Sequence, residues 1–372
     1  MQRAAAFLLL QLIAVTASTT PIEAAMKEVE RVRGLRFSKP VEVEVVPRSE
    51  LRSVLEAQIA RENPIPLIDH MKVLEALQLV DDGEKAVGQL MDVYEAQVLA
   101  FYDPSTGKYF TFDRAPDGNP LAAAMEEAVA IHELTHALQD QRFEAGTAVR
   151  ELEKNWDAQM AYHAVIEGEA TLVMLAAMME RVGISIEDLA GNRELVESMS
   201  TLAGSSAAFP ADAPAYFVEM LQFPYLKGLE LVMESFRRDG WDGVSRLHVN
   251  KPQSTDEVLE PARYFERVAS SKTLPCSDDG SVLSTTLGRF HWDFLLDEKA
   301  ARGWKGDCVR AIRKGGKLEI RGTSEWLSAA DAREFASALE ALFEEEKIEG
   351  SARRRGSNVT FSWRDAGPRP QP

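Results

Sequence analysis

Histidine and cysteine are scarce in this chain of 372 residues, which holds six of the first and two of the second. Both cysteines, Cys276 and Cys308, lie in the C-terminal third, far in sequence from the histidine motif described below. We therefore expect no cysteine among the ligands of a metal site. In an exported protein the pair can form a disulfide, and two free buried thiols are the alternative that the sequence leaves open.

Positive charge is also in deficit, with 42 lysines and arginines against 59 aspartates and glutamates and a formal net charge of −17. This balance opposes binding to the phosphate backbone of nucleic acids and to anionic membrane surfaces. We therefore expect no nucleic-acid partner. The one short basic cluster, Arg353 to Arg355, is interpreted as a solvated turn.

Long apolar runs are missing as well. The chain begins with Met1-Gln2-Arg3 and a mostly apolar stretch over residues 4–15, which is too short to span a bilayer but has the length of a signal-peptide core. Small residues follow, and Val15-Thr16-Ala17 offers a cleavage site. We expect residues 1–17 to be a signal peptide and the protein to be exported, either periplasmic or secreted, with no stable membrane span after cleavage. A retained anchor is the alternative.

What the chain does contain is an HExxH motif, His132–His136, whose flanks in the stretch Val129–Leu138 are uncharged. His132 and His136 are four residues apart, which places them about 40° apart around a helix, so both can bind one metal ion. Glu133 lies beside them, and a carboxylate there can act as the general base that activates a water molecule. The uncharged flanks predict a helix that passes through a core. An amphipathic helix with two surface histidines is the alternative.

A third metal ligand is expected on the next long helical pattern, residues 151–182, because a hydrolytic zinc site usually has three protein ligands. This segment carries Glu167 and Glu169, which lie about 200° apart around a helix, so only one of them can face the metal. We prefer Glu167, since the small Ala164 and Ala170 on its face would let this helix approach the first one closely. Glu169 is the alternative ligand, or could bind a histidine from behind.

Supporting residues follow from the same helical spacing. His163 and Thr171 lie four residues before and after Glu167, where they can reach the site as hydrogen-bond donors. Asp140, one turn after His136, could accept a hydrogen bond from a ligand histidine or a neighbouring side chain; a surface carboxylate is the alternative. Hydrolysis of a peptide also needs a donor to the developing oxyanion, and four candidates have suitable side chains: Tyr162, His163, Tyr225 and His248.

The HExxH motif, followed on a second helix by Glu167-Gly168-x-Ala170, resembles the gluzincin zinc metallopeptidases, the group that contains thermolysin and aminopeptidase N. The resemblance implies peptide-bond hydrolysis with Zn²⁺ held by His132, His136 and Glu167. Glu167 follows His136 by 31 residues, more than is usual in the aminopeptidases. A closer similarity is to uncharacterised secreted bacterial HExxH proteins, and it rests on Phe101–Pro104, His132–Gln141, Glu167–Thr171, Phe223–Tyr225, Ser254–Glu257 and Gly303–Asp307.

The expected fold class is α+β, with a mainly helical, zincin-like metalloprotease core, a small β-sheet and a small C-terminal α/β unit. After the signal peptide we expect a metallopeptidase-like domain over residues 25–269, the accessory unit over residues 270–366 and a disordered tail over residues 367–372. Strands are predicted at 40–47, 97–102, 108–113, 303–314, 317–322 and 358–363, and helices at 49–61, 67–80, 84–95, 120–143, 151–182, 223–239 and 328–346. Ser254–Glu257 has the pattern of a capping box.

The sequence as a whole therefore predicts an exported zinc metallopeptidase that acts on a peptide or protein substrate. The alternative from another class is a non-catalytic, zinc-containing protein of the cell envelope with a binding or structural role. A site of two histidines and one glutamate with a spare base favours catalysis, since structural zinc sites tend to be closed and rich in cysteine. No oligomeric state is predicted.

Overall fold

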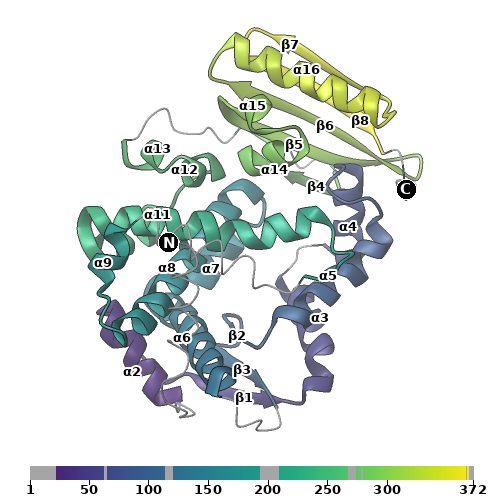
Figure 1. Cartoon of the computed structure of the whole chain (residues 1–372). Coiled ribbons are helices and arrows are strands. Elements are labelled where there is room, and N and C mark those ends of the chain that lie inside the picture. The colour runs from purple at the N-terminus through teal and green to yellow at the C-terminus, as the bar shows by residue number, and fades with distance from the viewer. Residues whose placement is uncertain are drawn as a thin grey trace.

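The computed structural model describes residues 22–62, 65–113, 120–192, 209–266, 274–277, 280–365 and 367. The expected signal peptide, the expected domain boundary at residue 270 and residues 368–372 of the expected tail lie outside these ranges. The fold is α+β and mainly helical, with two small sheets at opposite ends of the molecule (Figure 1). None of the helices in the described ranges has the length and apolar character needed to cross a bilayer.

The first sheet has three strands in the order β1-β3-β2, with β1 parallel to β3 and β2 antiparallel to it. The predicted hairpin is confirmed, because β2 (Ala100–Asp103) and β3 (Lys108–Phe112) are joined by a turn in which Gly107 has a φ of 72°. One face of the sheet forms a hydrophobic cluster with two helices, α3 (Leu51–Glu62) and α5 (Gly83–Gln97). The remaining elements of this part are α2 (Ile22–Arg33), β1 (Glu42–Val46), η1 (Arg48–Glu50) and α4 (Leu67–Ala76).

Two long helices that pack against each other carry the motif residues. The first, α6 (Pro120–Phe143), has the predicted bounds. The helix predicted over residues 151–182 corresponds to α8 (Trp156–Glu180), which begins five residues later than expected; a separate short helix, α7 (Ala145–Glu151), precedes it. The break between these two helices occurs because Asn155 caps α8, where its side chain accepts a hydrogen bond from the Ala158 N–H.

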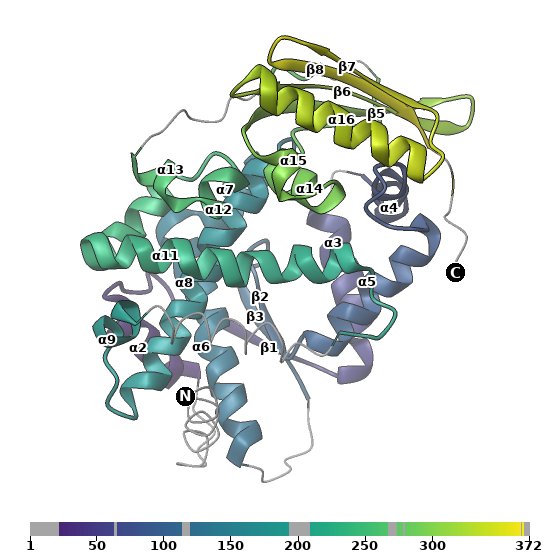
Figure 2. The ribbon, with the colours of Figure 1, turned by 45° about the horizontal axis from the view of Figure 1, so that its top comes forward.

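A third long helix, α11 (Ala215–Val249), lies across α8 (Figure 2). We expected a helix to begin at Phe223, and this is wrong by two turns, because Pro224 lies inside the helix. Burial of Tyr216 and Phe217 stabilises the turns that precede the proline. The helix is kinked at Gly240, whose φ is 59°, near the predicted end. Short helices flank it: α9 (Ile186–Gly191), α12 (Thr255–Leu259) and α13 (Pro261–Glu266).

Glycines allow α8 and α11 to cross at backbone contact. A Cβ atom on Gly168 would lie 2.3 Å from the backbone of Gly228, and one on Gly228 would lie 1.9 Å from the Ala164 carbonyl oxygen. We expected Ala164 to bring α8 close to α6, but the structure places it against α11. The close crossing positions Glu167 relative to α11, because Gly168 follows Glu167 directly.

The C-terminal unit is a five-stranded sheet in the order β4-β5-β6-β8-β7, with α16 along one face (Figures 1 and 2). Arg353 to Arg355, interpreted above as a turn, instead form part of the edge strand β7 (Gly350–Arg355), which pairs with β8. The predicted capped helix is confirmed, since Ser328 caps α16. The other elements are β4 (Leu283–Thr285), α14 (Gly288–Leu295), α15 (Glu298–Ala301), β5 (Trp304–Lys314), β6 (Lys317–Trp326), α16 (Ala329–Glu345) and β8 (Asn358–Arg364).

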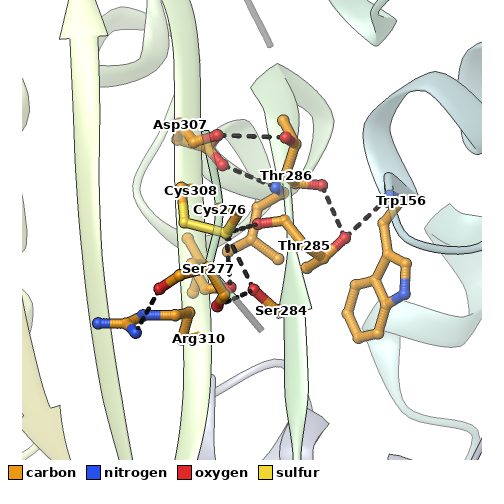
Figure 3. Close-up of a disulfide and its surroundings, with 11 residues drawn as sticks. Trp156, Cys276, Ser277, Ser284, Thr285, Thr286, Asp307, Cys308 and Arg310 are labelled. Carbon is orange, nitrogen blue, oxygen red and sulfur yellow. Dashed lines mark hydrogen bonds between the residues drawn. A yellow bond between two sulfur atoms is a disulfide. The ribbon is translucent and has the colours of Figure 1, made fainter. Parts of the chain in front are cut away.

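Cys276 and Cys308 form a disulfide that ties the segment before β4 to strand β5 (Figure 3). Beside it, the Arg310 guanidinium donates a hydrogen bond of 3.0 Å to the Ser277 hydroxyl. The structure therefore contains the disulfide and not the two free thiols that the sequence left as the alternative.

The C-terminal unit packs directly on the helical part, and one hydrophobic cluster runs through both. At the start of α8, the buried Asp157 carboxylate accepts a hydrogen bond from the Thr255 N–H, and Gly288 of α14 lies against the same carboxylate. The capping box predicted at Ser254 is wrong. The Ser254 side chain makes no capping bond, and the Glu257 carboxylate accepts from the Gln253 N–H rather than from the Ser254 N–H.

Candidate metal centre

The three predicted metal ligands converge on one point between α6 and α8. Oε2 of Glu167 lies 3.0 Å from Nε2 of His132 and 3.5 Å from Nε2 of His136. One ligand atom from each residue lies within 4.8 Å of the other two, and in the described part of the chain no other group of three such residues meets this condition. The i, i+4 spacing on α6 and the position of Glu167 on α8 therefore produce a compact set of two nitrogens and one oxygen.

The ionisation of Glu167 and that of His136 depend strongly on each other. Burial opposes ionisation of Glu167, but the charge of His136 and hydrogen bonds from both histidines hold its pKa well below the usual range. Burial also opposes protonation of His136, yet the Glu167 carboxylate outweighs it and raises the histidine pKa to about 9. Glu167 is therefore an anion that needs positive charge beside it, which a proton or a metal ion can supply.

Gln139 determines which nitrogen of His136 faces Glu167. Its side-chain NH₂ donates to the Ile166 carbonyl oxygen at 2.9 Å and to the Glu169 carboxylate at 2.7 Å, so its Oε1 is an acceptor. Nδ1 of His136, 2.9 Å from that oxygen, must then carry the proton. In neutral His136 this leaves the Nε2 lone pair directed at the site.

Glu169 belongs to a buried polar network behind the site. It forms an ion pair with Arg33 of α2, and both side chains are 1% exposed. Its other oxygen accepts from Nε2 of His248 at 2.5 Å, and Nδ1 of His248 lies 3.0 Å from the Tyr162 hydroxyl. Burial opposes ionisation, but the charges of Arg33 and His248 lower the pKa of Glu169. The alternative ligand is thus engaged elsewhere, and it reaches the ligand His136 only through Gln139.

Glu133 lies beside the three ligands and is held by the edge strand. Its carboxylate accepts a 3.0 Å hydrogen bond from the Tyr102 N–H of β2. Burial raises its pKa, an effect that the nearby His136 and His132 partly offset. Asp140 supports the same strand, since it accepts from the Tyr102 hydroxyl at 2.9 Å. Of the roles considered for Asp140, the structure shows the bond to a neighbouring side chain.

Tyr225 of α11 is the oxyanion candidate that the structure brings to the ligands. Its ring stacks on His132 with centroids 5.8 Å apart, and its pKa is well above the usual range because of burial, the charges of Glu167 and Glu133, and a hydrogen bond with Glu167. The residue as a whole is 40% exposed, so its ring borders solvent while its hydroxyl lies among the carboxylates of Glu167 and Glu133. Tyr162 and His248 instead belong to the network around Glu169.

The two remaining predicted residues differ in their surroundings. His163 lies close enough to Glu167 and His136 to feel their charges, and burial lowers its pKa. The Thr171 hydroxyl is buried and has no hydrogen-bond partner within the ranges that the structure describes, so it is not a donor to the ligands there.

Gln139 and Arg33 are the site residues that we did not predict. Gln139 lies three residues after His136, a spacing that places it on the same helix face and could have identified it. Arg33 had no such signal, because it is 136 residues from Glu169 and meets it only through the packing of α2 on α8.

Comparison with known families finds one match: the family DUF8575, described as a domain of unknown function, matches residues 262–369. The match covers the C-terminal unit and leaves out the segment that holds the candidate metal ligands. No curated protein and no solved structure matches the chain.

Proposed function

We propose that this protein is a zinc-dependent hydrolase of peptide bonds with a gluzincin-like site. The observation that carries the proposal is the convergence of His132, His136 and Glu167 within 4.8 Å, with the Glu133 carboxylate beside them. Two imidazole nitrogens and one carboxylate oxygen are the ligands of several hydrolytic zinc sites. The general base and the ligands come from the same two helices, so one packing arrangement positions both.

The donor set fits zinc. The proton on His136 Nδ1 is held by Gln139, so in the neutral imidazole Nε2 is free to bind a metal. The Glu167 anion supplies the negative charge that a divalent cation requires. Bound zinc would supply a Lewis acid that polarises a substrate carbonyl and makes a water molecule more acidic.

The other groups have roles that follow from their positions. Glu133, whose pKa is raised by burial, is suited to take a proton from the attacking water and pass it to the leaving amine. Tyr225 has a hydroxyl with a pKa well above its usual range, so it remains a hydrogen-bond donor and can stabilise the developing oxyanion. Strand β2 is at the end of its sheet, and apart from the Tyr102 N–H, which donates to Glu133, its edge could pair with an extended peptide.

Export is part of the proposal. The apolar stretch over residues 4–15 has the length of a signal-peptide core. The Cys276–Cys308 disulfide supports an oxidising compartment, since disulfides are rare in cytosolic proteins. The substrate is then a peptide or protein met in the periplasm or outside the cell.

The test compares zinc content and cleavage of a denatured protein substrate in the wild type, Glu133→Gln and Glu167→Ala. We expect about one zinc per chain in the wild type and in Glu133→Gln, with turnover lost in the latter, and loss of both in Glu167→Ala. Glu126→Gln is the matched control, because Glu126 is an exposed carboxylate two turns earlier on α6. Zinc without cleavage in the wild type would favour the non-catalytic alternative, and a folded, metal-free protein would exclude both.

A further inference from the structure

The C-terminal sheet has one covered face and one open face. On the covered side, Val309, Ile320 and Phe361 are buried. Side chains alternate along a strand, so their neighbours point the other way. The register places Arg310 of β5, Arg321 of β6 and Ser362 of β8 in one row across the open face. That face is hollowed by about 530 Å³, and the hollow is lined by Arg310, Arg321, Arg353, Thr323, Thr360, Ser351 and Ser362 among others.

The charge of this face is opposite to that of the protein. The hollow is lined by three basic residues, Arg310, Arg321 and Arg353, and by one acidic residue, Glu319, whereas the chain carries −17. Arg310 and Arg321 are directly opposite each other on neighbouring strands, where like charges destabilise a sheet, and the Glu319 carboxylate beside Arg321 offsets part of that repulsion. Glu319 pairs with Arg321, and Ser277 accepts a hydrogen bond from Arg310. These contacts leave the arginines on the surface of the hollow.

The lining also distinguishes between classes of anion. Phe361 is the one aromatic residue of the lining, and it is buried, so the hollow offers little surface on which sugars or nucleobases could stack. A concave surface fits a flat anionic membrane poorly, and the negative net charge of the chain also opposes binding to such a membrane. Arginine forks and hydroxyl groups are suited to carboxylates.

We propose that this arginine face, defined by Arg310, Arg321 and Arg353, binds an acidic polypeptide segment in an extended conformation. Carboxylates at alternate positions of an extended chain lie about 7 Å apart, which is also the spacing of alternate side chains along the strands of the sheet. The edge strand β7 carries Arg353 and Arg355 on this face and ends the sheet, so the bound segment could extend along it. The proposal does not depend on the hydrolytic function.

The test measures binding of a fluorescently labelled oligoglutamate peptide by anisotropy, at low salt and at high salt. The variant is the double substitution Arg321→Gln, Arg353→Gln. Its matched control is Arg302→Gln, Arg333→Gln, which removes the same charge from two exposed arginines outside the hollow, one directly after α15 and one in α16. Arg353→Glu is a second variant, chosen because one exposed edge-strand change should leave the fold intact, and thermal melting checks all of them.

We expect salt-sensitive binding to the wild type, weaker by about tenfold in the variant and unchanged in the control. Arg353→Glu should weaken it in the same direction. The proposal is overturned if the wild type does not bind the peptide, or if both double variants weaken it equally. It is also overturned if a sulfated polysaccharide binds at this face and oligoglutamate does not, which would assign the face to glycans.

Discussion

Gln139 contacts the candidate metal ligand His136 on one side and the buried Glu169 on the other, so the packing of the interior holds the orientation of the His136 ring. We predict that Gln139→Leu lowers zinc affinity by about 10- to 100-fold, because His136 then loses the acceptor that holds its ring and its tautomer. Competition with a chelator of known affinity measures the change.

The control for this prediction is Gln141→Leu. Gln141 is on the same helix, but its side chain accepts from the backbone N–H groups of Ser38 and Lys39 and does not touch the ligands. Equal zinc affinity in Gln139→Leu and the wild type would show that the tautomer is held by other means.

The second prediction about a single residue concerns Tyr225. If its hydroxyl stabilises the oxyanion, Tyr225→Phe should reduce kcat by about 10²- to 10³-fold while zinc content and KM stay close to those of the wild type. Steady-state kinetics with metal analysis separates these quantities. Tyr264→Phe is the control, since the Tyr264 hydroxyl donates to the Asn250 carbonyl oxygen. An unchanged kcat in Tyr225→Phe would assign oxyanion stabilisation to another group.

At the scale of elements, the crossing of α8 and α11 determines how Glu167 and Tyr225 face each other. We predict that Gly228→Ala destabilises the fold by about 1–3 kcal/mol or more, because the new methyl group would overlap the Ala164 carbonyl oxygen. Gly88→Ala in α5 is the control. Nothing lies within 4 Å of a Cβ there, and alanine should stabilise that helix by up to about 1 kcal/mol. Urea unfolding measures both, and equal effects would argue against backbone contact.

Asp157, at the start of α8, should make the free energy of unfolding depend on pH. Burial raises the pKa of Asp157 well above 3.8, the hydrogen bonds from Thr255 only partly offsetting this. A raised folded-state pKa gives stability that is fully present below the unfolded value and is lost as pH rises through the folded value. The wild type should therefore lose stability relative to Asp157→Asn as pH rises from about 4 to 8. Denaturant unfolding across this range checks the sign, and a constant difference would contradict it.

At the scale of the whole molecule, the Cys276–Cys308 disulfide closes a loop with a sequence separation of 32. We predict that Cys276→Ala, Cys308→Ala lowers the free energy of unfolding by about 3–4 kcal/mol, mainly because the unfolded chain gains freedom. Zinc content should not change, because the cysteines are not among the candidate ligands. Thermal and denaturant unfolding of the double variant tests this, and unchanged stability would mean that the loop is held in other ways.

Several elements could be predicted because each rests on local chemistry. The β2–β3 hairpin follows from its turn, α6 from the uncharged run around the HExxH motif, and α16 from its apolar spacing and the Ser328 cap. Errors occurred where tertiary burial outweighed a local signal. Pro224 is tolerated inside α11 because the turn before it is buried, and Arg354, in the cluster interpreted as a turn, forms a strand because β8 pairs with it.

The sequence by itself determined the histidine spacing, the neighbouring Glu133 carboxylate and the acidic balance, since each is a property of adjacent residues on one helix or of composition. Only the tertiary structure decided which glutamate meets the histidines, because both candidates are on α8 and their surroundings come from other helices. Arg33 and His248 engage Glu169 across 136 and 79 residues of chain, which leaves Glu167 facing the histidines. Contacts at that separation depend on how helices pack, and no local pattern records them.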